Sequence, residues 1–69
     1  MQHEPLSSTN LESFGYDPIS RTLEVRFKNG NTYQYNDVSP AFADGLRSAP
    51  SAGRYFQAEI RGRFHGVKQ

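Results

Sequence analysis

The sequence predicts an α+β fold, a three-stranded antiparallel β-meander followed by two short helices packed on one face. In the first half of the chain apolar and polar residues alternate, which is the period of a half-buried strand. In the second half apolar residues recur every three or four positions, which is the period of a helix. An Asn29-Gly30 pair between two alternating runs marks a hairpin. The chain has 69 residues and no cysteine, so packing alone must stabilise one small core.

The first two strands are predicted from alternation and turn chemistry. Leu11–Tyr16 ends at Asp17-Pro18, a pair that favours a turn because Asp accepts hydrogen bonds from its own downstream backbone and Pro fixes φ. In the next run, Leu23, Val25 and Phe27 alternate with charged residues. One face of this strand is therefore expected to be buried.

The length of the hairpin loop determines where the following tyrosines point. A two-residue turn would place Tyr33 and Tyr35 on the face opposite the apolar residues of the preceding strand. A three-residue loop, with Gly30 in the left-handed region as a G1 bulge, pairs Val25 with Tyr33 and Leu23 with Tyr35. We favour the longer loop because it places both rings on the apolar face.

Two helices are predicted after the third strand. Ser39 is a good N-cap and Pro40 suits the first helical position, where a missing N–H costs nothing. Pro50 ends this helix, Ser51 caps the next, and Gly62 is its expected end. The apolar positions are Phe42, Ala43, Leu46 and Ala49 in the first helix and Ala52, Tyr55, Phe56 and Ile60 in the second.

These elements make one predicted domain over residues 11–64. Residues 1–10 are mostly polar and are expected to form a loose arm, and residues 65–69 are expected to fray. No apolar run approaches the roughly 18 residues of a membrane span, and the first residues lack the pattern of a signal peptide. We therefore expect a cytoplasmic protein with no membrane contact.

The ordered combination of residues resembles the KTSC domain, a family named from the C-terminal extension of some lysyl-tRNA synthetases that also occurs as a stand-alone bacterial protein. The resemblance runs from about Ser7 to Phe64 and departs at Ser39, where the family more often continues Val-Pro directly. It implies an RNA-binding role and brings no catalytic residues with it. The matching residues are Gly15-Tyr16-Asp17, Leu23-x-Val25-x-Phe27-x-x-Gly30-x-x-Tyr33-x-Tyr35, Val38-x-Pro40, Leu46 and Ser51-x-Gly53-x-Tyr55-Phe56-x-x-x-Ile60-Arg61.

Basic residues gather at the C-terminal end of the chain. Residues 1–44 carry three basic and six acidic side chains, whereas residues 45–69 carry five basic and one acidic. Arg54 and Arg61 lie two helical turns apart, opposite the apolar face, as phosphate-binding residues would. The alternative is an ordinary solvated helix face with Asp44–Arg47 and Glu59–Arg63 ion pairs. The five basic candidates for RNA binding are Arg47, Arg54, Arg61, Arg63 and Lys68.

The tyrosines also allow two interpretations, base stacking or core packing. Tyr33 and Tyr35 share a face and are spaced like base-stacking aromatics on a sheet. We favour core packing, with both rings largely buried against Leu46, Phe56 or Ile60, because so small a core needs its aromatics. Exposed rings on a platform remain the alternative. Tyr16, beside a turn, and Tyr35 are the candidates for stacking on RNA.

Catalytic and metal chemistry find little support in the sequence. Ser39 and Ser51 are better explained as helix caps than as nucleophiles, and His65 lies in the C-terminal tail without an orienting carboxylate. A metal site would require His3 and His65 to converge from opposite ends of the chain. We expect no enzyme, no cofactor, no metal and no small-molecule substrate.

The sequence therefore supports two candidate functions. The first is a non-catalytic module that binds single-stranded or structured RNA through the basic residues. The alternative is a module that binds another protein or itself through an exposed strand edge or aromatic patch.

Overall fold

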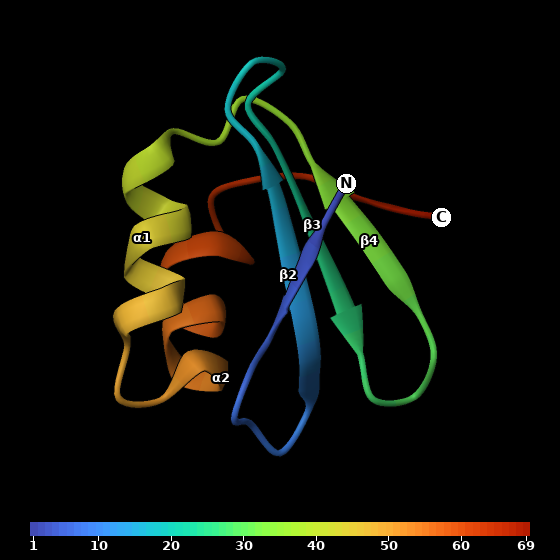
Figure 1. Cartoon of the computed structure of the whole chain (residues 1–69), viewed down its shortest axis with the longest axis vertical. Coiled ribbons are helices and arrows are strands. Elements are labelled where there is room, and N and C mark those ends of the chain that lie inside the picture. Colours follow the sequence, from blue (N-terminus) through green and yellow to red (C-terminus); the bar gives the residue numbers. More distant parts are fainter.

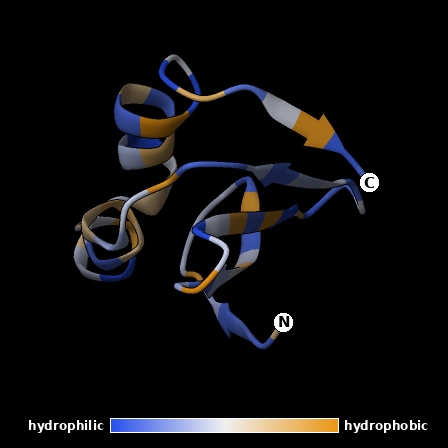
Figure 2. Cartoon of the chain, turned by 90° about the horizontal axis from the view of Figure 1, so that it is seen from above, coloured by the Kyte–Doolittle hydropathy of each residue, from blue (hydrophilic) through white to orange (hydrophobic).

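The computed structural model describes all 69 residues as a five-stranded antiparallel sheet with helices on one face (Figure 1). The sheet order is β1-β2-β3-β4-β5, so every strand lies beside its neighbours in sequence. Seen from above, the helices stand on one side of the sheet, and we call that side of the sheet the helix face and the other the outer face (Figure 2). The elements are β1 His3–Pro5, β2 Leu11–Asp17, β3 Thr22–Phe27, β4 Thr32–Tyr35, α1 Pro40–Ser48, α2 Ala52–Tyr55, the π-helical turn η1 Phe56–Ile60, and β5 Gly66–Lys68.

The α+β class is confirmed, but the sheet is larger than the predicted meander. The expected arm contributes β1 at one edge, and the expected frayed end contributes β5 at the other. Each of these strands has three residues, which is too short for an alternating pattern to be visible. Pro5, which has no N–H to donate, is tolerated in β1 because an edge strand needs only one side of its ladder.

The hairpin between β3 and β4 has the predicted three-residue loop. Gly30 has φ +96°, and its N–H donates to the Phe27 carbonyl at 3.0 Å, while the Phe27 N–H donates to the Asn31 carbonyl at 2.8 Å. Val25 pairs with Tyr33, and Leu23 pairs with Tyr35 in the same register. Both tyrosines therefore lie on the helix face, as predicted.

A bulge in β2 was not visible in the sequence pattern. Leu11 and Phe14 are both buried on the helix face although they are three residues apart, a separation that would put them on opposite faces of a regular strand. The register shifts between Leu11 and Ser13, and this extra residue restores the alignment of the two apolar side chains.

The helices begin where the sequence predicts. Ser39 is the N-cap of α1 and Pro40 its first residue, but the Ser39 side chain makes no capping hydrogen bond. Ser51 does cap α2, because its Oγ accepts from the Arg54 N–H at 3.3 Å. The second helix widens into η1 and ends at Ile60, before the expected end at Gly62.

The core lies between the sheet and the helices. Tight packing of α2 against α1 depends on Gly45, because a Cβ there would overlap the ring of Tyr55. The largest fully buried side chains are Phe14, Phe56, Leu11, Leu23, Leu46, Ile60, Val25 and Val38.

Candidate nucleic-acid interface

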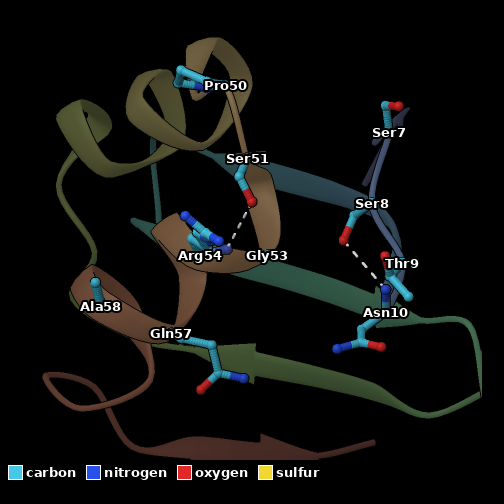
Figure 3. Close-up of a pocket in the computed structure, with 10 residues that line it drawn as sticks. All are labelled: Ser7, Ser8, Thr9, Asn10, Pro50, Ser51, Gly53, Arg54, Gln57 and Ala58. Carbon is cyan, nitrogen blue, oxygen red and sulfur yellow. Dashed lines mark hydrogen bonds between the residues drawn. The ribbon is translucent and has the colours of Figure 1, made fainter.

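A groove runs along α2 and η1, and it is walled on the other side by two loops. Its first part is a hollow of about 640 Å³ between residues 7–10 and residues 50–58 (Figure 3). The loop at residues 7–10 is ordered by Ser8, whose Oγ accepts hydrogen bonds from the N–H groups of Asn10 and Leu11 at 3.3 and 3.2 Å. This part of the expected loose arm therefore forms one wall of the groove.

Two smaller hollows extend the groove toward β4. The second, about 280 Å³, shares Asn10 and Gln57 with the first. The third, about 260 Å³, shares Phe56 and Arg61 with the second. The Lys28 N–H donates to the Asn10 carbonyl at 2.9 Å and so joins the two loops. We call the three adjoining hollows the α2 groove.

The α2 groove is lined by cations and by no carboxylate. Arg54, Arg61 and Lys28 line it, and no aspartate or glutamate does. The side chains of Arg54 and Lys28 make no ion pair or hydrogen bond, and the Arg61 guanidinium donates only to the neutral Gln57 Oε1, at 3.2 Å. These charges are available to an anion that enters the groove.

Arg47 is occupied elsewhere in the fold. Its guanidinium forms ion pairs with Glu4 and Asp44, both at 2.7 Å, and lies 5.4 Å from the centre of the Phe14 ring. The hydrogen bonds to Glu4 raise the pKa of Arg47 above its ordinary value, and the same contact lowers the pKa of Glu4. Arg47 thus fastens β1 to α1, which makes it a structural residue.

Arg63 is also paired. It contacts Glu59 at 3.4 Å, as the ion-pair alternative predicts, and its guanidinium lies 5.9 Å from the centre of the Phe42 ring. Of the five basic candidates, Arg54 and Arg61 line the α2 groove. Lys68 pairs with Tyr33 in the register of β5 and so shares its face of the sheet.

The three candidate tyrosines differ in accessibility. Tyr35 is only 5% exposed and packs edge-on against Phe56, with ring centres 5.8 Å apart, and its burial raises the pKa of its hydroxyl. The Tyr16 hydroxyl donates to the Val38 carbonyl, away from the groove. Tyr33 is half-buried and lines the third hollow. The prediction that both strand tyrosines are largely buried is therefore right for Tyr35, whereas Tyr33 is partly buried and packs against the edge of the core.

The two rings face different residues of β5, Gly66 beside Tyr35 and Lys68 beside Tyr33. A Cβ at Gly66 would overlap the Tyr35 ring, so that ring packs against the bare backbone of β5. Because β5 was not predicted, the sequence offered no means of telling the two tyrosines apart. Lys28 and the polar loop at residues 7–10 were missed for a similar reason, since their place beside α2 depends on contacts between distant parts of the chain.

A row of polar side chains on the outer face was also missed. His3 Nδ1 lies 2.7 Å from Ser13 Oγ, and His3 Nε2 lies 2.6 Å from Glu24 Oε1. Gln34 donates to the other Glu24 oxygen at 2.7 Å, and this hydrogen bond, followed by the contact with His3, lowers the pKa of Glu24. Gly15 stands between His3 and Glu24 in the register, so no side chain separates them.

The order carboxylate, imidazole and hydroxyl in this row is also the order of hydrolytic triads. Such sites also need donors for an oxyanion, but the backbone N–H groups of a sheet lie in its plane and do not point at a group resting on its face. The row instead connects β1 to β2, β3 and β4. We interpret it as the outer-face counterpart of the contact between Arg47 and Glu4.

No three His, Cys, Asp or Glu side chains come together in a way that would hold a metal ion. None of the helices has the length and apolar character needed to cross a membrane.

The fold and the groove define a small two-layer α+β domain in which a pair of helices covers one face of an antiparallel sheet. The chain belongs to the KTSC domain family, whose model matches residues 7–64. The structure superposes on the crystal structure of a KTSC domain protein from Yersinia pestis with a TM-score of 0.92 and 42% identity. That match covers 99% of this chain and 96% of the other.

Relatives of known sequence fall into two kinds. A protein of Tsukamurella paurometabola is 39% identical over 64 residues, which covers 93% of this chain and 96% of that protein. A lysine–tRNA ligase of Nostoc punctiforme is 35% identical over 54 residues, which covers 78% of this chain and 10% of the ligase. The domain therefore occurs in proteins of its own size and as a tenth of a much longer ligase.

Proposed function

We propose that this domain is a non-catalytic module that binds RNA through the α2 groove, with phosphates at Arg54, Arg61 and Lys28. The observation that carries the proposal is the set of three cations without a carboxylate along one groove. Phosphate contacts of this kind supply most of the affinity of proteins for nucleic acids. The relatives named lysine–tRNA ligase support RNA as the anion, because the name states that those proteins act on tRNA.

Binding through so few phosphates should be weak and sensitive to salt. Each phosphate contact on a single strand contributes about −0.7 to the slope of log affinity against log salt. Three contacts therefore give a slope of about −2, and raising the salt from about 50 to 200 mM should weaken binding by roughly 20-fold. An aromatic protein interface would show no comparable dependence.

The test is a chemical-shift titration of the labelled protein with a pool of short RNAs at low salt, repeated at high salt. Shifts are expected at groove residues such as Asn10, Gly53 and Gln57. The double variant Arg54→Glu with Arg61→Glu should lose binding while keeping its fold, because both side chains are exposed. A wild-type protein with no RNA-dependent shifts at about 50 mM salt would overturn the proposal.

A matched control separates the groove from net charge. Arg21 and Arg26 are exposed and make no ion pair, and Arg26 lies on the outer face of β3. Arg21→Glu with Arg26→Glu changes the net charge by the same amount as the groove variant. Equal loss of binding in both double variants would indicate general electrostatic attraction and would count against the groove.

A second candidate function is self-association through the edge of the sheet. Val67 in the edge strand β5 is 46% exposed, so an apolar side chain lies beside unpaired backbone groups. A second copy pairing there would form a concentration-dependent dimer. Light scattering across a concentration series tests it, and Val67→Lys should abolish the association, whereas salt should have little effect.

A further inference from the structure

The α2 groove ends at β4 in a hollow that has aromatic walls. Phe27 and Tyr33 are both half-buried and meet edge to face, with ring centres 5.7 Å apart and an interplanar angle of 82°. Phe56 lies behind Phe27 at 5.5 Å and is itself 2% exposed, so it forms a fixed floor. The hollow is therefore apolar on one side and held rigidly by the core.

The same hollow also has polar, uncharged lining residues. Asn29 and Asn31 line it from the hairpin loop. Asn29 Oδ1 accepts from the Asn31 N–H at 2.9 Å, which fixes that side chain and leaves its NH₂ group free to donate. The Asn31 carboxamide makes no hydrogen bond within the protein, so it offers both a donor and an acceptor.

Cations flank the hollow on the side where the groove continues. Arg61 lines both this hollow and the adjoining one. Lys68, paired with Tyr33, lies on the same face of the sheet. An aromatic wall, amide groups and a neighbouring cation are the features with which proteins hold an unstacked base beside its phosphate.

We propose that this hollow is a base pocket that takes one unpaired nucleobase of single-stranded RNA, against Phe27 and Tyr33 and within reach of Asn31. The inference rests on the proposed RNA binding and adds the kind of RNA bound. At about 260 Å³ the hollow is slightly below the range of about 300–1,000 Å³ typical of ligand pockets, so it suits a single ring system and not a whole nucleotide.

This proposal excludes double-stranded RNA as the preferred ligand. Bases in an A-form helix are stacked and paired, and their edges lie in grooves, so none can enter a hollow in the protein surface. A single strand can place one base in the pocket while its backbone continues along the α2 groove past Arg61 toward Arg54.

The experiment compares three ligands of known composition at low salt by fluorescence anisotropy. They are a five-nucleotide oligouridylate, a five-unit abasic ribose-phosphate chain and a short blunt-ended RNA duplex. The wild-type protein should bind the oligouridylate about tenfold more tightly than the abasic chain, within the usual range for one stacked base. The duplex, compared per phosphate, should resemble the abasic chain.

Two variants locate the effect. Asn31→Ala should reduce oligouridylate affinity toward that of the abasic chain, because it removes the base-facing amide and no hydrogen bond of the fold. Asn36→Ala, an exposed asparagine at the other end of β4, is the matched control and should bind like wild type. In wild-type protein, the ring protons of Phe27 and Tyr33 should shift with oligouridylate and not with the abasic chain.

The outcomes distinguish the pocket from the groove. Equal affinity of wild type for the oligouridylate and the abasic chain, without shifts of the ring protons, would overturn the base pocket while leaving phosphate binding in the groove intact. If neither ligand binds, both proposals fail. The ring-proton measurement uses wild-type protein, so the test stands even if the Asn31 variant does not fold.

Discussion

Replacing Tyr35 with alanine is expected to cost about 3–5 kcal/mol of folding free energy, the range for large aromatic truncations in a core. An aromatic side chain buries about 150–250 Å², which at about 25 cal/mol per Å² corresponds to roughly 4–6 kcal/mol. Tyr35 has nearly all of this burial, being 5% exposed and packed against Phe56 and the backbone of Gly66. Tyr33 is only partly buried, so Tyr33→Ala should cost less than Tyr35→Ala.

Urea unfolding followed by circular dichroism measures these changes, with Tyr35→Phe as the control. The Tyr35 hydroxyl is not left buried without a partner, and Tyr35→Phe keeps the ring, so this variant should unfold within about 1 kcal/mol of wild type. A domain of 69 residues is stable by roughly 3–10 kcal/mol, so Tyr35→Ala should be largely unfolded or show a much lower midpoint. An unchanged midpoint for Tyr35→Ala, or a larger loss for Tyr33→Ala, would refute the claim that the Tyr35 ring packs against the backbone of β5.

Two glycines and one carboxylate have separate, measurable effects on the stability of the fold. Gly30→Ala should destabilise the protein by about 1–3 kcal/mol because Gly30 has a positive φ. Gly62→Ala is the control, because a Cβ at either glycine meets nothing within 4 Å but Gly62 has no positive φ. Equal unfolding midpoints for the two variants would count against the loop assignment. Gly45→Ala should lower the melting temperature despite the usual gain of about 0.5–1 kcal/mol for alanine in a helix, and a rise would show that the second helix can retreat without cost. The pKa of Glu24 is lowered by Gln34, so the folded state binds fewer protons than the unfolded one and stability should fall as the pH drops through and below the ordinary pKa of 4.5. Glu24→Gln should reduce that fall, and an unchanged pH dependence of the urea midpoint would contradict it.

Local features of the sequence were sufficient for the middle of the fold. The parity of apolar residues in β3 and β4, together with Gly30, predicts both the loop and the register of the hairpin, because each depends on residues close in the chain. The starts of α1 and α2 were also predicted, since a cap acts within one turn. The family resemblance rests on these same local motifs, and the match over residues 7–64 confirms it.

The candidate site was predicted in part. The excess of basic residues in the second half of the chain is a property of composition, and Arg54 and Arg61 were named from their spacing of two helical turns within it. Charge counting does not show which cations are free, however. Arg47 is removed from the set by Glu4, 43 residues away in the chain, while Lys28 is added to it by the approach of its loop to α2.

By itself, then, the sequence determined the α+β class, the central hairpin, the helix starts and the family, because these follow from interactions among near neighbours. The tertiary structure alone decided the two edge strands, the bulge that aligns Leu11 with Phe14, the different burial of Tyr33 and Tyr35 and the assembly of the α2 groove. Each of these depends on pairing between segments far apart in the chain. The spacing of residues within one segment does not indicate which distant segment it will pair with, so these contacts are defined only in the folded chain.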